Sequence, residues 1–346
     1  MLFLIRNFAL CAMFLALAAC SPSPSEQAVD DAPLKTWRPF AADSPWNTPI
    51  PANPKIDAQS KALISDFAGS GSLYINIAEW SVPVYYIDMD ETPKHEVLDL
   101  YPGQYGRGFE LPREIPIPDG AQSARPQGGL GYIAIVDKAR NLEWDMRQAH
   151  QRDDGRWFTG FGAITNLRGN GVSPPWNEVD QPNLAASALA SGFPLTAGLI
   201  RVEEINSGRI PHALMFAYPG AMTDGFVSPA STAMPVADSA DVAARAGMPL
   251  GARIQLDPAF DVDGSDLSRE GKIIARALQE YGAYLGESAG GNVLFAESAP
   301  TQLEAWDGTL ASSELQGVFT PEMMAKHFRL IEMGDVLPGP PQTDPA

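Results

Sequence analysis

Cysteine is almost absent from this sequence, which contains only Cys11 and Cys20 in 346 residues. Cys11 lies in a segment that we expect to be removed during export, so Cys20 would be the only cysteine of the mature chain. This scarcity excludes a disulfide framework, a cysteine nucleophile and a thiolate metal site. In an oxidising compartment the fold would therefore depend on its hydrophobic core.

Basic residues are also scarce, since 24 Lys and Arg stand against 42 Asp and Glu and the net charge is −18. This imbalance argues against nucleic acid and anionic lipid surfaces as partners. A local basic cleft for an acidic substrate would still be compatible with an acidic surface.

Several common chemical signatures are missing as well. The sequence has no GxGxxG or Walker loop and no HExxH or GxSxG element, so it supports neither a nucleotide cofactor nor a zinc hydrolase. The acids at Asp257, Asp261, Asp263 and Asp266 lack the order of a calcium-binding EF-hand loop. We therefore predict no cofactor and no metal.

The first 20 residues have the pattern of an export signal. Arg6 supplies a positive start, and residues 8–19 are apolar but too short for a comfortable membrane span. The end of this segment, Leu17-Ala18-Ala19-Cys20, resembles the lipobox of bacterial lipoproteins. The resemblance implies a signal peptide over residues 1–19 and lipidation of Cys20. By the same resemblance, Ser21 after the cysteine implies the outer membrane. The alternative to a lipobox is an ordinary signal peptide with a chance cysteine.

Composition divides the rest of the chain into three parts. Residues 20–36 combine the acylated cysteine with a tether rich in Ser, Pro and acids, which cannot bury enough apolar surface to fold. Residues 37–336 are predicted to form a single β-rich globular domain, with no later stretch apolar enough to span a bilayer. Residues 337–346 are predicted to be a disordered tail.

The body of the chain is predicted to be mainly β. Gly and Pro number 31 each and interrupt the chain at short intervals, which is typical of many short strands and turns. Strands are expected at residues 73–77, 81–88, 132–136, 142–151, 156–164, 253–256 and 292–296. Between the strands at residues 142–151 and 156–164, the sequence Asp153-Asp154-Gly155 is a good hairpin turn.

One amphipathic helix is expected at residues 267–285, because its apolar residues recur at helical spacing. Asp266 or Ser265 could cap its start, and Gly286 could end it. One helix beside many strands predicts a β-sandwich or jelly-roll-like domain with the helix packed on it.

The segment 198–218 concentrates charge between two apolar runs. We expect a strand, one helical turn at residues 202–207, a stop at Gly208 and a second strand that begins near His212. His212 could be a buried structural histidine or a general base, with Arg201, Glu203 or Glu204 near enough in sequence to tune its pKa.

A second group of charges lies on the strand at residues 142–151. Alternation places Glu143, Asp145 and Arg147 on one face, with the two carboxylates about 6.5–7 Å apart at the backbone. That separation overlaps the range of roughly 5–9.5 Å used by glycosidases. A solvated strand face, on which the arginine balances two acids, is the favoured alternative.

Aromatic and amide side chains at turns could stack on sugars. The residues are Trp46 and Asn47, Trp80, and Trp176 with Asn177. The alternative for each tryptophan is that it fills a gap in the core.

Two motifs resemble those of a family of secreted bacterial proteins. These are ADSPWNTPI at residues 42–50 and GLIRVEEINSGRIPHAL at residues 198–214, followed by MPLGARIQL. The family pattern has a Gly-His pair where this chain has Gly129-Leu130-Gly131-Tyr132. The resemblance implies an exported protein of the same fold and attaches no reaction to it.

Together these features predict an outer-membrane-anchored lipoprotein of the bacterial envelope that acts on polysaccharide. Hydrolysis would use Glu143 and Asp145, whereas β-elimination would use His212 as base. In elimination, Arg201 or Arg147 would neutralise a uronate. The alternative is a non-catalytic lipoprotein that binds glycan or an envelope partner.

Overall fold

The computed structural model describes residues 37–77, 81–101, 108–109, 113–124, 131–178, 187–234, 246–298, 301, 306 and 310–341. The predicted signal peptide, Cys20, the tether and Trp80 lie outside these residues. Contacts place Thr36–Ala346 in one unit. No helix in the described part of the chain is long and apolar enough to cross a membrane.

The largest sheet has six strands, and its order is β1-β15-β10-β14-β13-β16. Its two central pairs differ in direction: β10 runs parallel to β14 and antiparallel to β15. The strands are β1 (Leu73–Asn76), β15 (Asn292–Phe295), β10 (Leu214–Ala217), β14 (Ala283–Glu287), β13 (Arg253–Leu256) and β16 (Phe328–Leu330). All four residues of β10 are buried, as expected for a central strand covered on both faces.

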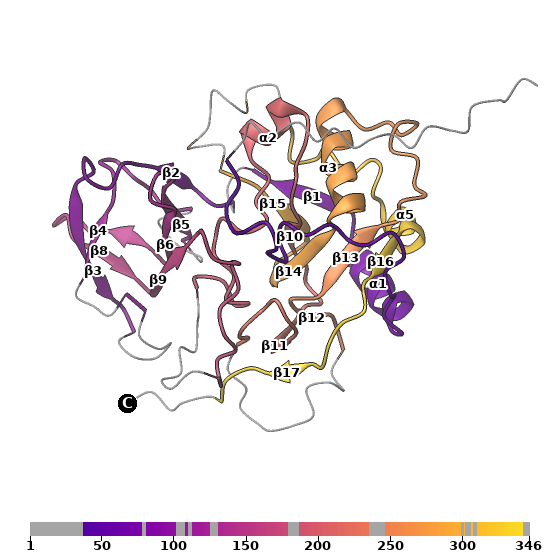
Figure 1. The fold of residues 1–346 in the computed structure, drawn as a ribbon, viewed down its shortest axis with the longest axis horizontal. Helices are drawn as coiled ribbons and strands as arrows, with labels where there is room; N and C mark the ends of the chain where they lie inside the picture. Colours follow the sequence, from indigo (N-terminus) through magenta and orange to yellow (C-terminus); the bar gives the residue numbers. More distant parts are fainter. Residues whose placement is uncertain are drawn as a thin grey trace, which may run out of the picture. The chain divides into compact units, whose positions relative to one another are not determined.

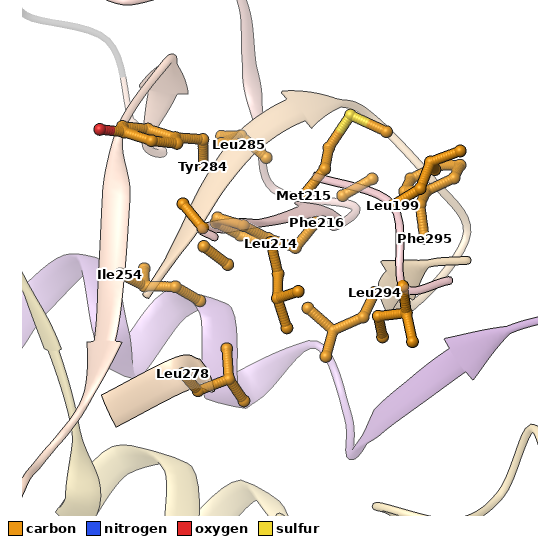
Figure 2. Close-up of a cluster of buried hydrophobic side chains, with 14 of the residues drawn as sticks. Leu199, Leu214, Met215, Phe216, Ile254, Leu278, Tyr284, Leu285, Leu294 and Phe295 are labelled. Carbon is orange, nitrogen blue, oxygen red and sulfur yellow. The ribbon is translucent and has the colours of Figure 1, made fainter. Parts of the chain in front are cut away.

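Helices cover one face of this sheet. The amphipathic helix α3 (Arg269–Glu280) lies beside β13, and Figure 2 shows its Leu278 beneath Leu214 and Ile254. α1 (Ser60–Gly69) packs against α5 (Pro321–His327) and β16. Phe67 of α1 contacts Phe216 of β10, with ring centres 5.4 Å apart. On the other face Met215 points away from α3 in Figure 2, and it packs closely against Gly286 and Gly198.

The predicted helix over residues 267–285 is shorter in the structure, and its end is different. α3 ends at Glu280, and Gly282 has a left-handed φ of +68° that turns the chain into β14. Leu285 therefore lies in a strand, and Gly286 ends no helix. The cap of the helix is Ser268, whose side chain accepts a hydrogen bond from the Gly271 amide, and neither Ser265 nor Asp266.

Two four-stranded sheets form a second region (Figure 1). Buried side chains from both sheets make up a smaller hydrophobic core. One sheet has the order β2-β5-β6-β9 and the other β4-β3-β8-β7. The strands are β2 (Val84–Tyr86), β5 (Ile133–Asp137), β6 (Leu142–Arg147), β9 (Phe161–Asn166), β4 (Arg113–Pro116), β3 (Lys94–Asp99), β8 (Trp157–Thr159) and β7 (His150–Gln151).

The sheet that contains β6 separates two cores. Ile133, Ile135 and Trp144 face the smaller core. Ala134 and Val136 of β5 face the larger core, which also contains the buried side chains of the six-stranded sheet. The two-residue periodicity of a strand produces this division, and both faces of the sheet are buried.

The mainly β prediction is confirmed. Each sheet contains at least one parallel pair, whereas a jelly roll consists of antiparallel strands. The expected hairpin is divided between two sheets, since β6 pairs with β9 and β7 pairs with β8.

A small sheet of three strands joins distant parts of the chain. Its order is β12 (Pro249–Leu250), β11 (Met222–Phe226) and β17 (Leu337–Pro338). Leu337 and Pro338 pair with Phe226 and Gly225. The start of the predicted disordered tail is therefore a strand, because its backbone completes the edge of β11.

Candidate functional site

Three backbone segments that are distant in sequence lie side by side and bring the candidate site together. Ile200 forms a parallel bridge with Ala296, and Val82 forms one with Glu297. The Glu297 amide donates to the Ile200 carbonyl at 3.0 Å, and the Ser298 amide donates to the Val82 carbonyl at 2.9 Å. Residues that follow these bridges, including Tyr86 on β2 and Arg201, are thereby placed near Glu297.

Local sequence fixes the position of Arg201. It precedes the short helix α2 (Val202–Ser207) with extended backbone angles, φ −104° and ψ 143°. Its backbone amide donates to the Glu204 carboxylate at 3.3 Å, which satisfies one of the free amides at the helix start. Gly208, with a φ of +89°, ends the helix as predicted.

Arg201, Glu204 and His212 form a buried charged cluster. Nη2 of Arg201 donates to Oε1 of Glu204, and Nε2 of His212 lies 3.0 Å from the same oxygen. The side chains of Arg201, Glu204 and His212 are 2%, 0% and 3% exposed. We call these three residues the Arg201 cluster.

Charge explains the ionisation of Glu204. Burial alone would raise the pKa of its carboxyl, but the neighbouring charges of Arg201 and His212 outweigh burial, and the pKa lies below its usual value. Glu204 is therefore an ionised carboxylate held between the Arg201 guanidinium and the His212 ring.

Both ring nitrogens of His212 face acceptors. Nδ1 lies 2.9 Å from the Ala213 carbonyl oxygen, and Nε2 faces the ionised Glu204 carboxylate. Both ring nitrogens are therefore engaged by protein groups, and the side chain is 3% exposed. This geometry favours the structural interpretation of His212 over the predicted general base, because the buried ring presents no nitrogen to a substrate.

Tyr86 and Glu297 form a second polar pair beside Arg201. The Tyr86 hydroxyl donates to Oε1 of Glu297. Burial, followed by the Glu297 charge, raises the pKa of Tyr86 well above its usual value, and burial also raises the pKa of Glu297. At neutral pH the tyrosine therefore keeps its proton next to a carboxyl group of raised proton affinity.

Aromatic and charged side chains form a partly exposed rim over these groups. The Trp37 and Tyr86 rings meet edge to face, with centres 6.2 Å apart. The Lys138 ammonium lies 3.9 Å from the centre of the Tyr86 ring and 3.5 Å from Oε1 of Glu203. The Lys138 and Glu203 side chains are 33% and 38% exposed, so this rim is where solvent reaches the site.

Glu143 and Asp145 share one face of β6, as the alternation predicted, but that face is not solvated. Both are completely buried beneath the segment 187–196. Glu143 accepts hydrogen bonds from the Thr196 amide at 3.0 Å and from the Thr196 hydroxyl, and Asp145 accepts one from the Ser187 hydroxyl at 2.7 Å. The favoured alternative of a solvated strand face is therefore wrong.

Burial also dominates the ionisation of this pair. It raises the pKa of Glu143 to about 8 and that of Asp145 to about 7, and the charge of Asp145 adds to the shift of Glu143. Most of their described polar partners belong to the covering segment 187–196, and the backbone of Ala163 on β9 is a further partner of Asp145. The pair thus has the geometry of a cross-link between that segment and β6, and its carboxylates do not face solvent.

Arg147, at the end of β6, is associated with a different acid. Its charge lowers the pKa of Glu287, although burial raises that pKa overall. The Tyr132 hydroxyl donates to Oε2 of Glu287 at 3.3 Å, and the Ala190 amide donates to the same oxygen at 3.0 Å. Arg147 therefore belongs to a second tyrosine–glutamate pair, separate from the Arg201 cluster.

The predicted sugar-stacking residues have different positions. Trp46 is 1% exposed and contacts the Phe193 and Tyr284 rings, which places it in the core. The Asn47 amide nitrogen donates to three carbonyls between Pro39 and Ala41, so it holds a turn. Both residues are therefore structural and not surface platforms.

The second turn remains partly accessible. The Trp176 indole nitrogen donates to the Pro338 carbonyl at 3.0 Å, and Asn177 is exposed. No described interaction joins this turn to the Arg201 cluster, and Trp80 lies outside the described residues.

Sequence reasoning did not identify Trp37, Tyr86 or Glu297. Tyr86 and Glu297 occur within or just after ordinary apolar strand runs, and Trp37 follows the predicted tether. A buried acid directly after a strand is the only signal that could have indicated Glu297, and it becomes visible when the strands are paired.

Neither metal-binding groups nor similarity to known proteins assigns a function to this chain. Within the described ranges, no three His, Cys, Asp or Glu side chains are grouped so that they could hold a metal ion. No protein-family model matches the chain, and no curated protein or solved structure shows significant similarity to it. The resemblance based on residues 42–50 and 198–214 therefore stays a prediction.

Proposed function

We propose that this chain is a bacterial envelope lipoprotein that acts on polysaccharide at the site formed by Tyr86, Glu297 and Arg201. The carrying observation is the Tyr86–Glu297 hydrogen bond next to a buried guanidinium and below a partly exposed aromatic rim. The Leu17-Ala18-Ala19-Cys20 pattern supports anchoring by a lipid on Cys20, with the outer membrane as the expected location.

The pair fits the role of proton donor. Cleavage of a glycosidic bond by hydrolysis or by β-elimination requires a proton on the leaving oxygen. In elimination the Glu297 carboxylate, which accepts the Tyr86 hydroxyl, would take the proton from the carbon next to the uronate carboxyl group. Tyr86 would give its own proton to the leaving oxygen, and Glu297 would then return a proton to Tyr86. The raised pKa of Tyr86 keeps its hydroxyl protonated before the reaction, and the raised pKa of Glu297 makes its carboxylate a stronger base.

The burial of Glu143 and Asp145 weighs against hydrolysis by those two acids. Glycosidases need both carboxyl groups at the sugar. Here Glu143 accepts a hydrogen bond from the Thr196 hydroxyl, and Asp145 accepts one from the Ser187 hydroxyl. β-Elimination is therefore the favoured reaction, and Arg201 would then neutralise negative charge on the substrate.

Non-catalytic binding of glycan is the second candidate. The Trp37 and Tyr86 rings with Lys138 across them form an aromatic and cationic rim that suits saccharide binding without chemistry. In that case the Tyr86–Glu297 pair would hold the rim in place.

The experiment is incubation of the detergent-solubilised full chain with a panel of polysaccharides. New reducing ends alone indicate hydrolysis, reducing ends with absorbance from unsaturated uronates indicate elimination, and binding without either indicates the second candidate. Tyr86→Phe should reduce turnover by about 10²–10⁴-fold, the range for general acid–base groups.

Tyr85→Phe is the matched control. Tyr85 lies next to Tyr86 but on the opposite face of β2, where its hydroxyl donates to the Gln122 carbonyl at 3.2 Å. Equal loss of turnover in the two variants would show that the effect comes from the strand and would contradict a proton-donor role for Tyr86.

A further inference from the structure

Three buried nitrogen atoms beside the Tyr86–Glu297 pair carry protons but have no hydrogen-bond partner among the described residues. They are Nε and Nη1 of Arg201 and Nε1 of the Trp37 indole. The guanidinium carbon of Arg201 lies 5.7 Å from the centre of the Trp37 ring, so the donors belong to one small region.

Such donors are expensive to leave unsatisfied. A buried donor without a partner costs about 1–3 kcal/mol, and more when it is charged. Nearly all buried polar groups in native proteins find a partner, so an exception calls for a missing acceptor. Here two of the three unpaired donors are on a cation, which makes an anion the best acceptor.

The acids near Arg201 are already engaged. Glu204 is shared between Arg201 and His212, Glu297 accepts the Tyr86 hydroxyl, and Glu203 pairs with Lys138 at the rim. Each carboxylate in the immediate surroundings therefore has a described partner other than the three free donors. Lys138 adds a further positive charge at the open side.

We propose that Arg201 and Trp37 bind the negatively charged group of an acidic sugar residue in the polysaccharide. This inference rests on the proposed function, because it names the substrate class of the same site. It would place the sugar ring at the rim of Trp37, Tyr86 and Lys138. A carboxylate and a sulfate ester share this chemistry, since each has one negative charge and several acceptor oxygens.

Calorimetric titration of the detergent-solubilised full chain tests the inference. The ligands are trigalacturonate, a sulfated trisaccharide and neutral maltotriose. We expect one or both acidic ligands to bind at least about tenfold more tightly than maltotriose, because each charge-assisted hydrogen bond contributes more than about one factor of ten. The comparison of the two acidic ligands identifies the charged group.

Trp37→Phe keeps the aromatic ring and removes the indole donor. It should weaken binding of the acidic ligand by about tenfold and leave maltotriose binding unchanged. Trp157→Phe is the control, because Trp157 lies in the smaller core between the two four-stranded sheets. Trp37→Phe avoids the folding risk of Arg201 substitutions, since Trp37 is only partly buried.

The outcomes separate the two proposals. The anion site is wrong if maltotriose binds as tightly as the acidic ligands. It is also wrong if the Trp37→Phe and Trp157→Phe variants have the same affinity for the acidic ligands. In both cases the proposed action on polysaccharide stands. If the chain neither binds nor cleaves any saccharide of the panel, the proposed function fails and the substrate class fails with it.

Discussion

Glu204 and Glu143 are both enclosed by protein, yet their pKa values move in opposite directions. Glu204 lies against Arg201 and His212, and these neighbours, Arg201 foremost, lower the pKa of its carboxyl. Glu143 has a second acid, Asp145, on the same strand face and is bound by a hydroxyl and an amide. Burial is common to both sites, so the cations account for the difference.

The comparison also separates two uses of a buried acid. The Glu204 carboxylate orients a guanidinium, whose other nitrogens, Nε and Nη1, have no hydrogen-bond partner among the described residues. The Glu143 and Asp145 pair binds the segment 187–196 to β6, and at neutral pH it retains a proton that an exposed pair would release. Only the first arrangement has a positive charge next to a partly exposed rim.

The strongest way to break the comparison is to remove the cation. Arg201→Met should lower the free energy of unfolding by about 3–5 kcal/mol, because it leaves the buried Glu204 charge with only His212. Denaturant titration measures the loss. Arg209→Met is the control, since Arg209 pairs with Glu280 at side-chain exposures of 36% and 37%, where the effect should stay below about 1 kcal/mol. A similar loss in both variants would contradict the account.

The next largest effect concerns pH at the Glu143 pair. The folded pKa values of Glu143 and Asp145 lie above those of the unfolded chain, so the unfolded state releases their protons first as pH rises. Their stabilisation is therefore complete below about pH 4 and is lost as pH rises to about 8.

Glu143→Gln isolates the contribution of Glu143 to this pH dependence. The variant cannot release the proton, so its free energy of unfolding should fall less between pH 5 and pH 8 than that of the original chain. Denaturant titrations at the two pH values provide the comparison. Parallel pH dependence in the two proteins would show that Glu143 ionises normally in the folded state.

His212→Gln should have an intermediate effect. Glutamine cannot donate to both Glu204 and the Ala213 carbonyl with the ring geometry of histidine, and losing one buried partner costs about 1–3 kcal/mol. The melting temperature should therefore fall by several degrees. A variant that melts normally but has lost turnover would instead restore the general-base hypothesis for His212.

The smallest effect is expected at the rim. Glu203→Gln breaks the pair with Lys138, whose side chain is 33% exposed, and should change the free energy of unfolding by less than about 1 kcal/mol. The change should shrink further in high salt, because exposed pairs are screened. A loss as large as that of Arg201→Met would mean that the rim and the buried cluster are one structural unit.

Local sequence predicted the features that depend on a few neighbouring residues. The turn of helix at residues 202–207 and its end at Gly208 follow from short-range preferences, and both are present in the structure. The alternation on β6 likewise placed Trp144 and Met146 opposite Glu143 and Asp145, because successive side chains of a strand point to opposite faces.

The boundary between α3 and β14 shows where local reasoning fails. Residues 283–287 continue the apolar pattern of the helix, so the sequence favoured helix as far as Leu285. In the structure, these residues pair with β10 and β13, and these backbone hydrogen bonds with distant strands override the local preference.

By itself, the sequence determined the mainly β class and the grouping of Arg201, Glu204 and His212 within one short segment, whereas the lipid anchor stays a prediction. Only the tertiary structure decided that Glu143 and Asp145 are covered by residues 187–196 and that Trp37, Tyr86 and Glu297 lie beside Arg201. The physical reason is that burial and charge pairing depend on which distant segments meet. Strand pairing across more than 90 residues, as between Val82 or Ile200 and the end of β15, leaves no pattern in neighbouring residues.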